Sequence, residues 1–466
     1  MNKYKRLICD MGIFALGSLG SKLITFLLLP LYTHVLSDAE YGIADLVFTI
    51  GQLLLPVVSL AIFNGLLRFG LMKDNTPEDA LRCATEVFFF GSIVAIIITP
   101  LLHFIPSIGE WSIYLCGYVI SSFAVSNGMV YLKVKDKNKI YSALSILQTL
   151  TLVIFNIVFL ILLKLGIQGY LLSYILSNLI TAIATFIFGK MYHDLKLSKR
   201  NMALLKAMVA FSIPYILNDI SWWAIHSVNK ILIEIMLGSA ILGIFTAASK
   251  IPSLINTVAS IFTQAWGISS IKEHDSTNDT SFYAKVFDYF LVFVFGACIA
   301  ANTIMKPFMK LYVSDEFFSA WHYVPLLLLG AVFSAIASFM GSLLGAAKKT
   351  KNLMISTLIA SVVNVIVSYV LIKFVGLWGA VIGTLLSYIV VAVCRMFEVR
   401  KYIVFNYGTK KLIALSIVTL CHAVLLGMDY HIIWVSIAAI VLYIGIIFPN
   451  IKHAVSAIRE KLSKKQ

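Results

Sequence analysis

Three lysines stand inside, or at the edge of, runs of otherwise apolar residues: Lys22, Lys230 and Lys250. A charge at the centre of a bilayer costs at least about 2.5–3.5 kcal/mol on insertion scales, so such residues usually face a bundle interior or a hydrated cavity. Fixed ammonium groups in a low-dielectric cavity suit a phosphate or diphosphate. These lysines are therefore candidate anion-binding residues, with Arg68 of "NGLLRFG" a further candidate at the cytoplasmic mouth of the cavity.

The stretch "YILNDISWWAIHSVNK" carries the richest polar stripe of the chain. Asp219, one of the two tryptophans (Trp222 or Trp223), His226 and Lys230 recur at helical spacing, so they share one face. Tryptophan faces suit the apolar sides of sugar rings. The carboxylate and the imidazole could titrate or bind a coupling cation, because burial and neighbouring charges shift pKa values.

Depth along the predicted helices narrows the choice of partners. Lys22 lies about 11 residues into the first helix, roughly 16 Å from its cytoplasmic end. Asp219 lies at a similar depth in the seventh helix, whereas Asp45 lies at the outer end of the second helix, too far from that depth to pair with Lys22. Three charges at mid-depth, with Lys250 as the third, suggest a common hydrated cavity.

Structural roles stay open for several of these residues. Lys22 and Asp219 could form an ion pair that holds two halves of the protein together, and the two tryptophans could be ordinary helix packing. His226 could be a hydrogen-bonded residue of the bundle, and Arg68 an interfacial anchor.

The elements that position these residues are membrane-spanning helices. Hydrophobic residues make up 60% of the 466 positions and charged residues 13%, against about 25% in soluble domains. Apolar runs of about 20 residues predict an all-α polytopic membrane protein with about fourteen transmembrane helices. The predicted spans are 11–36, 43–66, 84–105, 111–132, 141–163, 167–189, 207–229, 238–268, 285–306, 322–345, 353–374, 377–399, 411–428 and 431–450.

Signatures of enzymes and metal sites are missing from the sequence. It contains no HExxH, no GxSxG and no glycine-rich phosphate loop, and its six cysteines form no CxxC pair. We therefore expect no catalytic residue, no metal and no cofactor. A membrane-embedded glycan polymerase or ligase is the remote alternative, but the predicted external connections are short, and the Asp315–Glu316 pair is better explained as part of a solvated loop.

Most of the 37 lysines and arginines fall on one side of the predicted membrane. With the amino end cytoplasmic, the internal segments collect them, including Arg395 and Arg400 at the end of the twelfth span. The positive-inside rule then places both termini in the cytoplasm. This distribution accounts for most of the net charge of +15 without a nucleic-acid partner.

Two weak repeats recur in the same order at nearly equal spacing. "LSDAEYG" at 36–42 matches "LGSAILG" 201 residues later, and "GIQGYLLSYILS" at 166–177 matches "GLWGAVIGTLLS" 210 residues later. Helices 1–6 and 7–12 are thus predicted to be two pseudo-symmetric six-helix lobes. Because parallel repeats place substrate sites between the halves, a central cavity is expected between these lobes. The predicted divisions are 1–206, 207–405 and a terminal helix pair with a basic tail, 406–466.

At the level of motifs the chain resembles Wzx-type polysaccharide and O-antigen flippases of the multidrug/oligosaccharidyl-lipid/polysaccharide exporter superfamily. The resemblance rests on "GSKLITFLLLPLYTHVLSDAEYGIADLV", "FSIPYILNDISWWAIHSVNKILI", "LGIFTAASKIPSLINTVASIFTQAW" and the paired G-x-x-G element. Members of this family commonly carry "DR" or "DK" near the end of helix 7, where this chain has Asn229 and Lys230. The terminal helix pair is similar to that of the lipid II flippases of the same superfamily.

The resemblance implies translocation of an undecaprenyl-diphosphate-linked oligosaccharide across the bacterial plasma (inner) membrane by alternating access, for lipopolysaccharide or other surface polysaccharide biosynthesis. It further implies a cationic cavity and a lipid-embedded prenyl tail. No ATPase motif is present, so a proton or sodium gradient, or the membrane potential, would supply the energy. Two alternatives of the same fold stay open, a multidrug or cation antiporter and a lipid II flippase.

Overall fold

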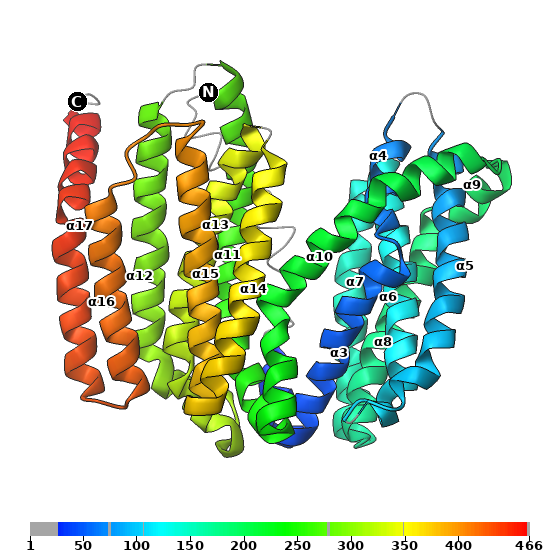
Figure 1. Ribbon diagram of the computed structural model, residues 1–466, viewed down its shortest axis with the longest axis horizontal. Helices are drawn as coiled ribbons and strands as arrows, with labels where there is room; N and C mark the ends of the chain where they lie inside the picture. Colours follow the sequence, from blue (N-terminus) through cyan, green and yellow to red (C-terminus); the bar gives the residue numbers. More distant parts are fainter. Residues whose placement is uncertain (1–26, 73–75, 106, 277–279, 348, 464–466) are drawn as a thin grey trace. The chain divides into compact units, whose positions relative to one another are not determined.

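The computed structural model describes residues 27–72, 76–105, 107–276, 280–347 and 349–463, and in this part of the chain all regular elements are helical (Figure 1). The predicted all-α class is confirmed. Contacts divide the chain into two compact units that meet in sequence between Thr246 and Ala247. We call the described residues up to Thr246 the first unit and those from Ala247 onward the second unit.

The first unit contains eleven elements and the start of a twelfth. They are α2 (Leu29–Val35), α3 (Asp38–Val58), α4 (Ile62–Gly70), α5 (Pro77–Leu102), η1 (Gly109–Trp111), α6 (Ser112–Val134), α7 (Asn138–Asn156) with its π-helical end η2 (Ile157–Leu162), α8 (Gly166–Phe188), α9 (Met191–Leu197), α10 (Met202–Leu237) and the start of α11 (Ser239–Ser276).

The second unit takes the rest of α11 and the remaining helices. They are α12 (Thr280–Tyr312), η3 (Asp315–His322), α13 (Val324–Ala346), α14 (Thr350–Val375), α15 (Leu377–Arg400), α16 (Thr409–Gly427) and α17 (Ile432–Ser463). The predicted loop after 306 is thus largely helical, because α12 continues to Tyr312 and η3 follows.

Twelve helices in the described part of the chain are long and apolar enough to cross a membrane. The first predicted span, 11–36, lies mostly outside the described residues. The last corresponds to a shorter apolar stretch, Ile432–Phe448, within α17. The described residues therefore form a multi-pass membrane protein.

The predicted second span, 43–66, is broken into two helices. Leu60 and Ala61 have positive φ angles of 49° and 47°, and they separate α3 from α4. A non-glycine residue in the left-handed region costs roughly 1–2 kcal/mol, so the surrounding packing must hold this break. Gly91 of α5 supplies such packing, because a Cβ there would meet the carbonyl oxygen of Val58.

The G-x-x-G element, at 166–169 and at 376–379, starts a helix in each unit. Gly166 and Gly376 have φ angles of 55° and 58°, and each starts a helix, α8 and α15. Three residues later, Gly169 and Gly379 lie close to the preceding helical segment. Only glycine adopts the first conformation freely, and at 379 only glycine permits the close backbone approach, whereas the approach at 169 is tight but less severe.

A neutral polar network joins α6, α7 and α8 in the first unit. The Gln148 amide donates to Asn178 Oδ1 at 2.8 Å, and the Asn178 amide donates to Ser122 Oγ at 3.0 Å. Ser177 Oγ donates to the carbonyl of Gln148 at 2.5 Å. These bonds satisfy polar groups within the apolar unit, as a membrane interior requires.

The corresponding helices of the second unit, α13, α14 and α15, enclose an arginine. Arg395 is 2% exposed and donates to the carbonyl of Ala337 at 2.8 Å, to Ser356 Oγ at 3.2 Å and to Thr357 Oγ1 at 3.0 Å. A Cβ on Gly341 would lie 2.9 Å from its guanidinium. Arg395, counted among the cytoplasmic charges in the sequence, thus packs inside the helix bundle, and the side of the membrane on which it lies stays a prediction.

Helices α16 and α17 are fixed to α12 at several levels. Lys411 contacts Asp288 Oδ1 and Asn450 Oδ1, each at 2.7 Å. Farther along, the Tyr443 hydroxyl donates to the carbonyl of Val292 at 2.6 Å. At the other end of α12, Lys306 lies 2.7 Å from Asp429 Oδ1, in the turn between α16 and α17. We call these contacts the terminal clasp.

An ionic cluster ties α5, α6 and α9 at one end of the first unit. Lys135 Nζ lies 2.6 Å from Glu78 Oε1 and 3.5 Å from Asp194 Oδ2, which also accepts from the Tyr131 hydroxyl at 2.7 Å. Burial alone would lower the pKa of Lys135, but the hydrogen bond and charge of Glu78, with those of Asp194, raise it above its ordinary value. Burial would likewise raise the pKa of Asp194, yet the Tyr131 and Lys135 contacts lower it.

The two units follow contacts, whereas the predicted lobes follow the sequence repeat. In the first unit α10 packs against α3, α4 and α5, although the repeat assigns it to the second lobe. The terminal pair belongs to the second unit by its contacts. The lobes 1–206 and 207–405 and the separate segment 406–466 stay predictions.

Candidate functional site

The two copies of the first repeat meet where α3 and α11 begin. Ser37 caps α3, accepting from the Glu40 backbone N–H at 3.3 Å while the Glu40 carboxylate accepts from the Ser37 N–H at 2.9 Å. A Cβ on Gly42 would collide with the carbonyl of Ser239, and one on Gly243 would collide with that of Asp38. The two backbones therefore touch at repeat-related glycines, and we call this contact the Gly42–Gly243 crossing.

One turn beyond the crossing lies an ion pair between a buried carboxylate and a partly buried lysine. Lys230 Nζ of α10 lies 2.5 Å from Asp45 Oδ2 of α3, with side-chain exposures of 16% and 7%. Thr246 Oγ1 of α11 donates to the same carboxylate oxygen at 3.3 Å, and Lys230 Nζ lies 3.4 Å from Thr49 Oγ1. Asp45 and Thr246 are themselves 201 residues apart, the spacing of the repeat. We call these four residues the Asp45 cluster.

A tryptophan fixes α10 against α3 beside the cluster. The Trp223 indole N–H donates to the carbonyl oxygen of Thr49 at 2.8 Å. Trp223 and Lys230 are seven residues apart, two helical turns, so both face α3. The predicted shared face of these two residues is therefore present, directed at Asp45 and Thr49.

Aromatic residues line the same face of α3. Tyr41 and Phe48 lie one turn on either side of Asp45 in sequence, and both are buried. Their rings contact Tyr170 of α8, with centroid distances of 6.2 Å and 5.4 Å, and Tyr32 of α2 lies 4.6 Å from Tyr170. The sequence signal was the spacing i, i+4, i+7 of Tyr41, Asp45 and Phe48, which places an acid within an aromatic stripe.

Sequence reasoning missed Asp45 as the partner of Lys230. It compared acids only with the depth of Lys22, whereas Asp45 is seven residues after the first residue of α3 and Lys230 seven before the last of α10. In the predicted spans, Asp45 lies two residues after the start of 43–66 and Lys230 one residue after the end of 207–229, and this shared position at outer helix ends was the available signal. An acid and a base at one depth have reason to pair, because an isolated buried charge is costly.

The other predicted site residues fall in different places. Lys22 lies outside the described residues, as does the side chain of His226 on α10. Asp219 and Trp222 are half-buried on α10, and Lys250 is half-buried on α11 in the second unit, and each takes part in an interaction. Arg68 is exposed in the last turn of α4, where a cation also complements the helix dipole.

The Asp45 cluster holds a single carboxylate and an ammonium group, which does not make a metal site. Within the described part of the chain, no group of three or more His, Cys, Asp or Glu side chains could hold a metal ion. What the cluster can do is hold or exchange an ionic partner at Lys230 in surroundings of low dielectric.

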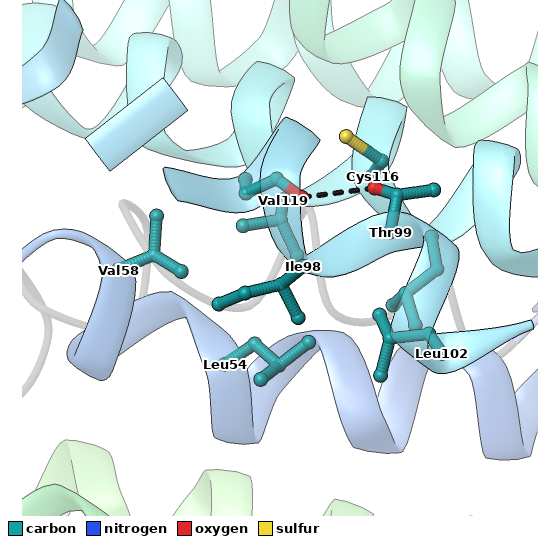
Figure 2. A pocket seen from close by; sticks show the side chains of 9 residues that line it. Leu54, Val58, Ile98, Thr99, Leu102, Cys116 and Val119 are labelled. Atoms are coloured by element: carbon teal, nitrogen blue, oxygen red, sulfur yellow. Dashed lines mark hydrogen bonds between the residues drawn. The ribbon is translucent and has the colours of Figure 1, made fainter. Parts of the chain in front are cut away.

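A small apolar cavity elsewhere in the first unit has a structural explanation. It measures about 10 Å³ and lies among side chains of α3, α5 and α6, including Leu54, Ile98 and Leu102 (Figure 2). Its hydroxyl is already used, because Thr99 Oγ1 donates to the carbonyl of Ala95 at 2.9 Å. This volume suits one water molecule at most, so the cavity is a packing defect.

Comparison with known proteins identifies the family. The family of polysaccharide biosynthesis proteins matches residues 8–266, more than half of the chain, and the chain belongs to it. No curated protein sequence matches the chain.

Solved structures share the fold over most of the chain. The lipid II flippase MurJ in an inward closed conformation is 14% identical, with a TM-score of 0.69, covering 95% of this chain and 99% of its own. An inward-facing multidrug resistance MATE family transporter of the MOP superfamily is 16% identical, with a TM-score of 0.63, covering 85% and 94%. A MATE structure in complex with MaL6 is 14% identical, with a TM-score of 0.61, covering 86% and 97%.

Proposed function

We propose that this member of the polysaccharide biosynthesis protein family is a flippase rather than an enzyme. Its substrate would be a polyprenyl-diphosphate-linked oligosaccharide, carried across the bacterial plasma membrane by alternating access. The observation that carries the proposal is the family match over residues 8–266. The fold shared with a lipid II flippase over 95% of this chain supports it, since that protein's name describes a lipid-linked substrate.

The proposed roles of individual residues follow from their chemistry. Lys22, Lys230 and Lys250 would bind the diphosphate, because ammonium groups pair with phosphate oxygens. Arg68 would stand at the cytoplasmic mouth, and both chain termini would be cytoplasmic. The tryptophans at 222 and 223 would contact sugar rings. Asp219 and His226 would bind a coupling proton or sodium ion, or serve in charge pairing.

A multidrug exporter is the second candidate, and the MATE structures of the same fold favour it. Organic cations would call for acids along their path. The lysines at 22, 230 and 250 argue instead for an anionic substrate.

The test uses proteoliposomes loaded with a fluorescent polyprenyl-diphosphate oligosaccharide. We expect the wild type to accelerate translocation and Lys22→Gln to abolish the acceleration at normal yield and stability. Lys310→Gln is the matched control, because Lys310 is exposed near the end of α12. Equal activity of Lys22→Gln would remove Lys22 from the site. A wild type that moves organic cations and not the lipid would replace the flippase with the exporter.

A further inference from the structure

Lys230, one of the lysines proposed to bind the diphosphate, already forms an ion pair with the Asp45 carboxylate. We propose that Asp45 is a positioning residue that competes with the anionic substrate for Lys230 and thereby keeps the bound diphosphate releasable. The inference rests on the proposed function, and it adds a role for a residue outside the predicted site.

The geometry makes Lys230 the partner that can move. Its side chain is 16% exposed against 7% for Asp45, so an incoming anion reaches the ammonium more readily than the carboxylate. Lysine is a point charge on a flexible four-carbon stem with three rotatable donors, so it can turn toward a second acceptor. Its contact with Thr49 Oγ1, at 3.4 Å, is long and easily exchanged.

Asp45, in contrast, is held in place. Thr246 Oγ1 donates to the same oxygen that contacts Lys230, and the Gly42–Gly243 crossing fixes the backbones of α3 and α11 one turn away. The Trp223 indole anchors α10 to the Thr49 carbonyl. The carboxylate therefore stays where it is when the lysine side chain changes partner.

Competition then sets how tightly an anion binds. A diphosphate that approaches Lys230 meets an ammonium group already partly neutralised by a carboxylate at 2.5 Å, and it is repelled by that carboxylate. Coupling between two sites of a protein typically changes affinity by about 5- to 150-fold, and we take the lower part of that range for the effect of Asp45 on an anion at Lys230. A transporter benefits from such a penalty, because a substrate held by an unopposed buried cation would leave slowly.

The conservative variant Asp45→Asn isolates this competition. An asparagine side chain keeps the shape and an oxygen that accepts from Thr246, but it removes the negative charge. We expect Asp45→Asn to lower the Kd for farnesyl diphosphate about tenfold and to reduce the maximal flipping rate, so that affinity and rate change in opposite senses. Lys230→Gln should weaken binding, Lys230→Arg should retain it, and Asp45→Asn/Lys230→Gln should bind as weakly as Lys230→Gln.

The measurement is equilibrium binding to the full chain in detergent, with farnesol as the uncharged control and inorganic pyrophosphate as competitor, alongside thermal stability of each variant. Competition by pyrophosphate would assign recognition to the anion itself. Failure of pyrophosphate to compete, with farnesyl diphosphate still responding to Asp45→Asn, would assign it to the lipid diphosphate. Both results keep Asp45 as the competitor.

A purely structural pair gives another pattern. Each single neutral variant would then lower the melting temperature, the double neutral variant or the reversed pair Asp45→Lys/Lys230→Asp would restore it, and the Kd for farnesyl diphosphate would stay unchanged throughout. That pattern overturns the inference. If Asp45→Asn tightens diphosphate binding while the wild type flips no labelled oligosaccharide, the competition stands and the proposed function fails. If the wild type flips the labelled oligosaccharide but Asp45→Asn leaves the Kd for farnesyl diphosphate unchanged, the proposed function stands and the competition by Asp45 fails.

Discussion

Helices α6–α8 of the first unit and α13–α15 of the second are paired by the predicted repeat, yet their interiors differ in chemistry. The first is joined by amides and hydroxyls, centred on Asn178. The second encloses the guanidinium of Arg395. At the spacing of 210 residues, the counterpart of Arg395 is Thr185, which packs against Gly128. The two sets of helices therefore share the positive-φ glycine that starts α8 and α15, and not the polar group that they surround.

This difference predicts how much free energy of unfolding each unit loses when a buried polar side chain is removed. A neutral network can lose one hydrogen bond at a modest free-energy cost, because transmembrane interhelical bonds average about 0.6 kcal/mol. Hydrogen bonds to a charged group are worth more, about 1.5–3 kcal/mol each, and their loss strands buried acceptors. We therefore expect the second unit to be the more sensitive of the two at this position.

The largest expected effect is that of truncating the arginine. Arg395→Ala should destabilise the protein by about 3–5 kcal/mol, since it leaves a cavity and removes the donors to Ala337, Ser356 and Thr357. Its partner in the comparison, Asn178→Ala, should cost about 1–2 kcal/mol. Denaturation of the purified protein in detergent, followed by intrinsic fluorescence, measures both. Equal costs would contradict the distinction between charged and neutral interiors.

The repeated glycines give the next largest contrast. A Cβ at Gly379 would collide with the backbone of Leu371 and Ile372, which cannot move aside locally, so Gly379→Ala should cost about 1–3 kcal/mol. At Gly169 the nearest atom would be the Phe159 Cβ at 3.0 Å, and Gly169→Ala should cost less than about 1 kcal/mol. Melting temperatures of the two variants decide the order, and a reversed order would show that the α8 approach is the tighter one.

The smallest effect concerns the ionic cluster of the first unit. Asp194 has a lowered pKa, so its contribution to stability is present above its unfolded pKa and is lost as the pH falls through the folded value, below about 3.8. Asp194→Asn should lower stability at pH 6 by less than about 1 kcal/mol, because Lys135 keeps Glu78 as its partner and the asparagine oxygen still accepts from Tyr131. Between pH 5 and pH 3, the melting temperature of this variant should also fall less than that of the wild type.

The control for this change is Asp429→Asn in the second unit, which removes the acid that contacts Lys306 at the terminal clasp. That carboxylate is 47% exposed, and its loss should leave the acid-induced change of melting temperature as in the wild type. If the melting temperature fell less with decreasing pH in Asp429→Asn than in the wild type, and Asp194→Asn behaved as the wild type, the acid sensitivity would belong to Asp429 of the second unit and not to Asp194.

Apolar run length and the repeats predicted the helices well, because a membrane rewards continuous hydrophobic segments regardless of their neighbours. The break after Val58 was not predictable, since Leu60 and Ala61 carry no sign of a positive φ and the packing of Gly91 holds them there. The hydrogen-bond and ion-pair partners of side chains were the hardest to predict from the sequence, because they depend on which helices pack together.

Within the candidate site, the shared face of Trp223 and Lys230 followed from helical periodicity. The identity of their partner did not. Asp45 is carried by a helix nearly 200 residues away in the chain, and its pairing depends on α10 packing against α3, which a repeat-based division into lobes does not suggest. The roles of Lys22 and Lys250 stay predictions.

The terminal clasp has a consequence for biogenesis. It joins Asp288 of α12 to Asn450 of α17, across 162 residues, and Val292 to Tyr443 across 151. During synthesis from the amino end, α12 must therefore enter the membrane before its partners exist, and Asp288 waits without Lys411 until the last two helices emerge. Assembly of the second unit can finish only after α17 has been synthesised, so premature stop codons within α16 or α17 should leave an inserted but unassembled protein open to membrane proteases.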